Sequence, residues 1–275
     1  MTAGSKLETL RGALARESAV IVAYSGGADS AFLADVAHEV LGNRALAVTA
    51  VSASLATDER EAARSLAVER GWRHREVETF ETERAEYIRN APDRCYHCKT
   101  ELFETLAGLV SADAGTVVLV GTNLDDESDV RPGQRAAWER GVRAPLLEAG
   151  LTKEEIRALS RARGLRTWNK PASACLASRI AYGVEVTPER LDRVARAESF
   201  LRSLGVEQLR VRDHGDLARI EVPLSDVERL ASDDLRSKVA AFMRELGFAY
   251  VTLDLEGFRS GSMNAVLLEI GRRGV

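Results

Sequence analysis

The sequence predicts an α/β fold with a doubly wound, mainly parallel sheet, followed by a smaller C-terminal α+β domain. Short apolar runs rich in β-branched residues alternate with segments of helical spacing through most of the chain. A glycine-rich turn joins the first of these runs to the first helical segment. The pattern restarts with shorter runs after a loop, so we expect one domain over 1–183 and a second over 184–275.

The first domain is predicted from buried strands that alternate with helices. Residues 19–24 (AVIVAY) have the length and β-branched content of a buried strand, and helical spacing follows the turn SGGADS over 31–41. The further elements are a buried strand (45–51), an exposed helix (58–70), a short strand (74–77), another buried strand (116–120) and a capped helix (152–163). This alternation implies a parallel sheet, whose ligands bind at the carboxyl ends of the strands.

The second domain is predicted after a loop over 168–183 that shows little periodicity. A capped helix follows over 187–204, with Pro188 in its first turn. The remaining elements are short strands at 208–212, 218–222 and 250–255 and helices at 225–230 and 234–246. Together they indicate a small α+β arrangement.

Composition limits the functional classes. The chain has 275 residues and a formal net charge of -4, which argues against a protein whose main role is to bind nucleic acid. The N-terminus lacks a signal-peptide pattern, and no apolar run reaches the roughly 18 residues of a membrane span. We therefore expect a cytoplasmic protein without a membrane partner.

The turn SGGADS has the features of a phosphate-binding loop. It lies between a buried strand and a helix, where backbone N–H groups and the helix dipole favour an anion. Gly26 and Gly27 allow close approach of the backbone, Ser25 and Ser30 add hydroxyls, and Asp29 suits Mg²⁺ or an orienting role. A plain tight turn is the alternative for a bare Ser-Gly-Gly.

The pattern SGGxDS resembles the signature of the PP-loop ATP pyrophosphatases, which cleave ATP between the α- and β-phosphates. This resemblance implies that a substrate oxygen attacks the α-phosphorus and that pyrophosphate leaves into the loop. The segment Gly121-Thr122-Asn123, followed by Asp125 and Asp126, resembles the second nucleotide-side motif of these enzymes. A solvated acidic loop is the alternative for this segment.

A more specific resemblance is carried by segments spread over nearly the whole chain. They are AYSGGADS, PDRCYHCK, VGTNLDD, RPGQRAAWERGVRAPL, EAGLTKEEIR, KPASACLASRIAYGVEVT and DLEGFRSGSMN. They resemble the LarE family of ATP-dependent sulfur transferases, which act in making the nickel-pincer nucleotide cofactor of lactate racemase. In that family the carboxylates of pyridinium-3,5-biscarboxylic acid mononucleotide are adenylated and converted to thiocarboxylates.

The resemblance also implies partners and further site residues. It implies ATP, Mg²⁺, a small-molecule nucleotide substrate, a homo-oligomer assembled through the second domain, a sulfide source or cysteine desulfurase, and the nickel-inserting enzyme of the same pathway. Ser178, Arg179, Arg210 and Arg212 would bind the phosphate of the substrate; an edge strand decorated with charge is the alternative for the last two. Glu198 and Glu221 match acidic positions near the active site of the family, although Glu198 could equally lie on a solvated helix face.

The three cysteines leave the source of sulfur open. The resemblance places the sulfur carrier at Cys175, which would form a thioester and, in a sacrificial reaction, become dehydroalanine. Cys95 and Cys98 add a CxxC pair on one face of a helical turn, so we expect the three thiolates to ligate a [4Fe–4S] cluster that delivers sulfur. A zinc site completed by His97 or His214, and a pair that is only packed or transiently oxidised, are the alternatives.

Two other functions share parts of this sequence pattern. A tRNA thiolation enzyme would also adenylate and transfer sulfur, but it would need a basic surface that the acidic balance does not supply. A non-catalytic iron–sulfur or nucleotide sensor could have the same fold. The intact polar residues of the glycine turn weigh against a sensor.

Overall fold

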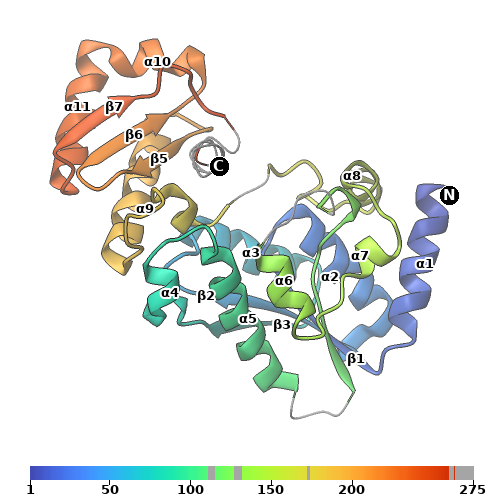
Figure 1. Cartoon of the computed structure of the whole chain (residues 1–275). Helices are drawn as coiled ribbons and strands as arrows, with labels where there is room; N and C mark the ends of the chain where they lie inside the picture. The colour runs from blue at the N-terminus through green and yellow to red at the C-terminus, as the bar shows by residue number, and fades with distance from the viewer. Residues whose placement is uncertain (111–114, 127–131, 172–173, 260–262, 264–275) are drawn as a thin grey trace, which may run out of the picture. The chain divides into compact units, whose positions relative to one another are not determined.

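The computed structural model describes residues 1–110, 115–126, 132–171, 174–259 and 263 (Figure 1). The chain divides into two compact units, and neither is a continuous stretch of sequence. Unit 1 comprises residues 1–81 and 95–173, and unit 2 comprises residues 82–94 and 174–275. The expected domains 1–183 and 184–275, with different roles, stay a prediction. Residues 82–94 belong to unit 2, and no sequence pattern indicated this membership.

Unit 1 is built on a sheet of four parallel strands in the order β3-β2-β1-β4. The strands are β1 (Ala19–Ala23), β2 (Ala45–Val51), β3 (His74–Glu78) and β4 (Thr116–Leu119). The chain moves from β1 outward to β3 and then returns to the other side of β1 to form β4. The carboxyl ends of β1 and β4 therefore flank a topological switch point, where ligands of such sheets bind.

Helices cover both faces of this sheet, so the predicted doubly wound α/β class is confirmed. Val20 and Val22 pack on one face against α1 (Ala3–Ala15), α2 (Ala28–Leu41), α3 (Thr57–Glu69) and α8 (Lys153–Ala162). Ile21 packs on the other face against α5 (Arg94–Val110) and α6 (Pro132–Trp138). The side chains of β1 thus alternate between two cores, as the period of a strand requires. The short helix α7 (Pro145–Glu148) completes the unit.

Local sequence explains how α2 and α8 begin. The predicted capping box of α8 is present, because the Thr152 side chain accepts from Glu155 N and the Glu155 side chain accepts from Thr152 N. The helix α2 begins instead at Gly27, which makes no side-chain capping bond. The first N–H groups of α2 therefore have no cap from their own N-terminal residue, although a helix needs partners for them.

Unit 2 contains a mixed sheet in the order β5-β6-β7, with β5 antiparallel and β7 parallel to β6. The predicted second α+β arrangement is confirmed. Its elements are α4 (Ala85–Ile88), the 3-10 helix η4 (Leu176–Arg179), α9 (Pro188–Ser203), β5 (Arg210–Asp213), β6 (Leu217–Glu221), α10 (Leu224–Ala231), α11 (Asp233–Glu245) and β7 (Tyr250–Leu253). A single core, which includes Leu201, Val211, Ile220 and Met243, joins α9 and α11 to the sheet.

No helix among the residues that the structure describes is long and apolar enough to cross a membrane.

Candidate functional site

The glycine turn of unit 1 forms a tight loop between β1 and α2. Gly26 has a φ of 72°, and a Cβ added to it would lie 2.9 Å from the Cβ of Ala63, so only glycine fits without strain. The hydroxyls of Ser25 and Ser30 lie 3.0 Å apart, and Ser25 N donates to the Ser30 hydroxyl over 3.2 Å. The loop thus presents two hydroxyls beside the uncapped start of α2, an arrangement suited to an anion.

The turn after β4 meets this loop at the switch point. A Cβ added to Gly121 would lie 2.8 Å from Ser30 N, so the two backbones pass each other in direct contact. Thr122 and Asn123 follow in the same turn, and Asn123 is 2% exposed, with its side-chain oxygen accepting from Asp125 N. The two segments that the sequence singled out are therefore adjacent in unit 1. Their roles in binding ATP stay predictions.

Asp29 has the most informative environment at this site. One carboxylate oxygen pairs with Lys153, and the other is buried without a hydrogen-bond partner among the described residues. Burial raises the pKa of Asp29 above its usual value, while the charge of Lys153 opposes that rise. A buried carboxylate oxygen without a partner, close to Asp126, fits the oxygen ligands that Mg²⁺ requires. The residues present are thus compatible with Mg²⁺ at this position.

Two lysines at this site were not predicted from the sequence. Besides pairing with Asp29, Lys153 donates its backbone N–H to the Asp125 carboxylate over 2.6 Å. Lys170 donates to the Gly26 carbonyl over 3.1 Å and pairs with Glu59 at 2.5 Å. They bring positive charge to a loop that itself contains no lysine. The only sequence signal was that Lys153 follows the helix cap at Thr152.

In unit 2, Ser178 and the buried Arg179 hold the backbone around Cys175. The thiol of Cys175 is exposed, and its carbonyl accepts from Ser178 N (3.0 Å), the Ser178 hydroxyl (2.7 Å) and Arg179 Nη1 (3.1 Å). Arg179 Nη1 also donates to the Ala174 carbonyl over 2.5 Å. Ser178 and Arg179 therefore fix the segment that carries the cysteine. Their expected contact with a substrate phosphate stays a prediction.

The two acidic residues predicted near the site are buried in ion pairs. Glu198 is 1% exposed and pairs with Arg179 at 3.0 Å, so the alternative that it lies on a solvated face is wrong. Glu221 is fully buried and accepts from Arg212 over 2.8 Å and from Arg219 over 3.0 Å. These pairs tie η4 to α9 and β5 to β6. A catalytic role of Glu198 and Glu221 is not tested.

Arg210 differs from its neighbours, because its described hydrogen bond goes to a neutral carbonyl. It donates to the Leu209 carbonyl over 2.7 Å, and its guanidinium lies 5.3 Å from the centre of the Phe258 ring. Burial lowers the pKa of Arg210, and the positive charge of Arg179 lowers it further. An anion bound here would relieve this repulsion and would suit the planar guanidinium.

The cysteines are divided between the units. Cys95 and Cys98 lie on α5 in unit 1, and Cys175 lies at the start of η4 in unit 2. Within the described residues, no group of three or more His, Cys, Asp or Glu side chains is arranged to hold a metal ion. The three-cysteine cluster site therefore stays a prediction. Parts of the segments around Arg131, Ala172 and Ser260 lie outside the described residues.

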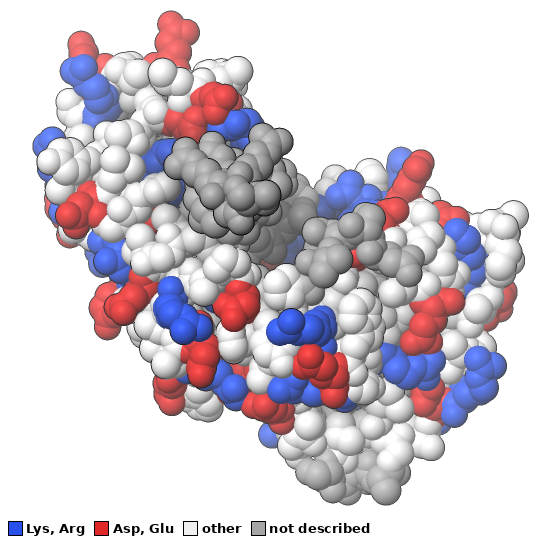
Figure 2. All heavy atoms as spheres, in the orientation of Figure 1, with Lys and Arg blue, Asp and Glu red and all other residues white. Residues whose placement is uncertain are grey.

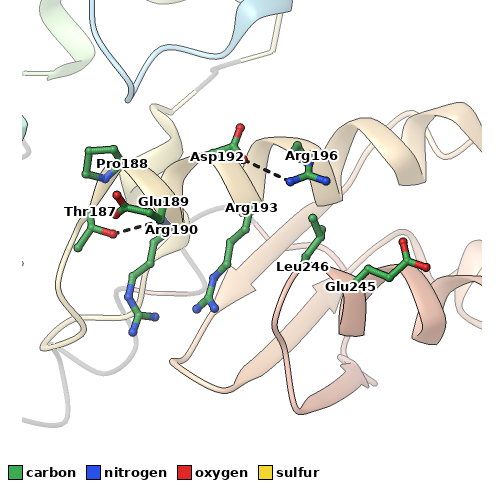
Figure 3. A pocket seen from close by; sticks show the side chains of 9 residues that line it. All are labelled: Thr187, Pro188, Glu189, Arg190, Asp192, Arg193, Arg196, Glu245 and Leu246. Carbon is green, nitrogen blue, oxygen red and sulfur yellow. Dashed lines mark hydrogen bonds and ion pairs between the residues drawn. The ribbon is translucent and has the colours of Figure 1, made fainter.

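A cavity that is not part of the predicted site lies in unit 2. It has a volume of about 630 Å³ and is lined by the first turns of α9 and the end of α11 (Figure 3). Arg190 and Arg193 extend to the same side of α9, but both pair with the fully buried Asp213. On the molecular face drawn in Figure 2, Lys and Arg are interspersed with Asp and Glu. Neither feature adds to the predicted site.

Comparison with known proteins identifies relatives that extend over almost the whole chain. No protein-family model matches. The chain is 46% identical over 263 residues to the uncharacterized protein slr1717 of Synechocystis sp., covering 96% of this chain and 98% of that protein. It is 39% identical over 269 residues to the pyridinium-3,5-bisthiocarboxylic acid mononucleotide synthase of Lactiplantibacillus plantarum, covering 97% of this chain and 96% of the relative.

An archaeal relative covers a smaller part. The uncharacterized protein MJ0830 of Methanocaldococcus jannaschii is 33% identical over 173 residues, covering 63% of this chain and 67% of its own length.

Proposed function

The chain belongs to the LarE family of pyridinium-3,5-bisthiocarboxylic acid mononucleotide synthases, and from this premise we propose that it converts carboxylates of pyridinium-3,5-biscarboxylic acid mononucleotide into thiocarboxylates at the expense of ATP. The supporting observation is the meeting of the loop 25–30 with the turn after β4, at the sheet position where nucleotides bind. The product would serve as a precursor of the nickel-pincer nucleotide.

The first step is adenylation of a carboxylate. A carboxylate oxygen of the substrate attacks the α-phosphorus of ATP, and pyrophosphate leaves with the electrons of the broken P–O bond. The loop amides, Lys153 and Lys170 would stabilise the negative charge of the leaving pyrophosphate, and Asp29 would hold Mg²⁺. The carboxylate carbon becomes a good electrophile because AMP is a better leaving group than oxide.

Exchange of labelled pyrophosphate into ATP tests this step. We expect exchange with the bis-carboxylic mononucleotide and none with a pyridinium mononucleotide that lacks both carboxylates. Asp29→Asn should abolish exchange, because it removes the charge that we assign to Mg²⁺ binding. Exchange that needs no carboxylate, or that survives in Asp29→Asn, would refute the adenylation step.

The source of sulfur is the second part of the proposal. Cys95, Cys98 and Cys175 would hold a [4Fe–4S] cluster with one iron open to bind sulfide from a separate donor. The bound sulfide would attack the activated carboxyl carbon and displace AMP, and a further sulfide from the donor would renew it. In the alternative route, the Cys175 thiolate displaces AMP to form a thioester. Its Cα proton then passes to solvent, the electron pair forms the Cα=Cβ bond, and the thiocarboxylate leaves with the sulfur. The exposed thiol of Cys175 supports either route.

Iron and acid-labile sulfide in anaerobically purified protein separate the two routes. About four iron atoms per chain, lost in Cys95→Ala, Cys98→Ala and Cys175→Ala, would support the cluster. Protein that stays free of iron after reconstitution would contradict the cluster. The sacrificial route then requires that Cys175 lose one H₂S in mass after a single turnover.

A further inference from the structure

The segment that carries Cys175 is held by side chains rather than by regular secondary structure. Between residues 174 and 186 the main regular element is the one-turn helix η4. Carbonyls along this segment nevertheless accept hydrogen bonds from buried groups, as the contacts of Arg179 with Ala174 and Cys175 illustrate. Arg212 likewise donates to the Ser178 carbonyl over 3.2 Å.

Residues 82–94, which are distant in sequence, supply further donors to this segment within unit 2. The Asn90 side-chain amide donates to the carbonyls of Ala181 and Val184, each over 2.8 Å. Arg94 Nη1 donates to the Ala177 carbonyl over 3.0 Å and also to the Asn90 side-chain oxygen. Asn90 is fully buried and Arg94 is 5% exposed, so water cannot readily replace these donors.

The backbone of Asn90 is left-handed at the residue after the C-cap of α4, where Asn and Gly commonly end a helix. Its φ is 55°, and among the described residues it is the one non-glycine residue with positive φ. Asparagine tolerates a positive φ better than most residues, although a positive φ is uncommon in all residues other than glycine. This conformation ends α4 at the residue whose side-chain amide donates to Ala181 and Val184.

We propose that Asn90 and Arg94 form a buried bracket that positions the Cys175 segment for sulfur transfer. The bracket is defined by the Asn90 amide, the Arg94 guanidinium and the carbonyls of Ala177, Ala181 and Val184. Both are positioning residues, since their hydrogen bonds go to backbone carbonyls and to each other and not to the reacting sulfur. The inference rests on the proposed function and deepens it, because it applies whether Cys175 is a cluster ligand or a sacrificial donor.

The position of Arg94 gives the bracket a second consequence. Arg94 is the first residue of α5 and is bonded directly to Cys95, and Ala177 follows Cys175 by two residues. The hydrogen bond between Arg94 and Ala177 therefore joins, within unit 2, the residue that precedes Cys95 in the chain to the segment that carries Cys175. A fixed backbone at this link favours the transfer step and has no direct part in adenylation.

Hydrogen exchange of the intact protein tests the bracket without any substrate. Asn90→Gly keeps the positive φ but removes the amide, and Arg94→Met removes the donor. In both variants we expect amides of residues 174–186 to exchange faster, while peptides of 19–41 in unit 1 keep their wild-type rates. The exposed Arg16, replaced in Arg16→Met, provides the matched control. Arg94→Lys retains a charged donor and should give an intermediate rate.

The same variants should separate the two chemical steps. We expect pyrophosphate exchange to match that of wild type and thiocarboxylate formation to fall about 100-fold, as misplacement by about 1 Å can cause. Three results would overturn the bracket. The first is wild-type hydrogen exchange in residues 174–186 of the variants, and the second is faster hydrogen exchange in all peptides. The third is wild-type thiocarboxylate formation in a variant whose residues 174–186 exchange faster. Wild-type protein that makes no thiocarboxylate would instead refute the proposed function. The hydrogen-exchange result on residues 174–186 would remain valid.

Discussion

Individual residues of the nucleotide loop were predictable from sequence, but the charges that complete the site were not. Glycines between a buried strand and a helix indicate a phosphate loop through local geometry alone. Lys153 and Lys170 contact Asp29 and Gly26 across 124 and 144 residues of sequence. Such contacts depend on how α8 and the segment that follows it pack in unit 1. The spacing of residues along the sequence does not predict this packing. The same reasoning explains why Glu198, paired with the distant Arg179, was not predicted to be buried.

Lys153→Met should impair adenylation at the level of a single side chain. Lys153 lowers the pKa of Asp29 against the effect of burial, so its removal should raise that pKa further and weaken Mg²⁺ binding near neutral pH. We expect pyrophosphate exchange to fall about 100-fold, as after the loss of one charge-stabilising donor, with partial recovery at higher pH. Initial rates against pH measure both effects.

The matched variant is Lys238→Met, which removes an exposed lysine of α11. It should leave the exchange rate unchanged. A Lys153→Met enzyme with the pH profile of wild type would show that the ion pair with Asp29 has no role in the reaction.

Arg210→Met should act on the substrate and not on ATP. Arg210 lies among positive groups and forms no ion pair with a carboxylate of the described residues, so its guanidinium is well placed to take an anion. We expect the KM for the mononucleotide to rise about tenfold or more, the change for one charge-assisted contact, while the KM for ATP stays constant. Arg236→Met, at an exposed ion pair on α11, serves as the comparison. Equal changes in both KM values would contradict this assignment.

At the scale of elements, the strands of unit 1 were predicted closely and several helices were missed. The strand β2 has the predicted bounds, because a run of seven apolar and β-branched residues is buried on both faces. The helix α5 has buried residues at helical spacing, namely Leu102, Phe103 and Leu106. Only the helical turn of its CxxC pair was predicted from the sequence, and not the whole helix. The helix α1 packs mainly on α2, and its buried Leu7, Leu10 and Leu14 have the i, i+3, i+7 spacing from which this helix was predictable.

Gly121→Ala tests the contact between the β4 turn and α2. The added Cβ would lie 2.8 Å from Ser30 N, a backbone atom that cannot move without shifting the helix. We expect a loss of about 1–3 kcal/mol in the free energy of unfolding, as for overpacking of an interior, together with loss of pyrophosphate exchange. Urea unfolding gives the first quantity.

A Gly→Ala substitution in α1 should instead increase the free energy of unfolding. Gly12 lies within that helix, and nothing lies within 4 Å of an added Cβ. Gly12→Ala should therefore stabilise the protein by about 0.5–1 kcal/mol through helix propensity. A Gly121→Ala protein as stable as wild type would show that the two backbones can separate.

Two histidines should make the stability of unit 1 depend on pH. His38 Nε2 accepts from Arg73 N over 3.0 Å and links the end of α2 to the start of β3, while His74 contacts the buried Thr49 hydroxyl at 2.9 Å. Burial lowers the pKa of both below the usual 6.5. Their stabilising contribution is therefore complete above about pH 6.5 and is lost as the pH falls toward the lowered values.

Urea midpoints between pH 7.5 and about 5.5 measure this dependence. His38→Gln and His74→Gln should each reduce the slope, because glutamine does not titrate in this range. If both variants kept the wild-type dependence of the urea midpoint on pH, the two histidines would not contribute to the pH dependence of stability.

At the scale of the whole molecule, the sequence indicated two domains and the structure shows two units that are interleaved along the chain. The change in pattern near residue 183 marks where regular helix and strand spacing resumes. The side-chain contacts of unit 2 begin earlier, because Arg179 pairs with the buried Glu198 and Ile180 bridges to Asp213. Residues 82–94 join this unit through Asn90 and Arg94, a non-local contact that local periodicity does not report.

This difference predicts where unit 2 can be separated as a stable chain. A single chain that joins 82–94 to 174–275 through a flexible Gly/Ser linker retains the Arg179–Glu198 pair, whereas one that starts the second segment at residue 184 loses Arg179. Among the described residues, the Glu198 carboxylate, which is 1% exposed, would then keep only the Arg202 guanidinium and the Val211 N–H as partners. Breaking a buried pair in this way costs about 3–5 kcal/mol, so the shorter chain should unfold at much lower urea concentration. Arg179→Met in the longer chain should reproduce most of that loss. Equal urea midpoints for the two chains would mean that the unit begins at residue 184, as the change in sequence pattern indicated, and that residues 174–183 contribute little to its stability.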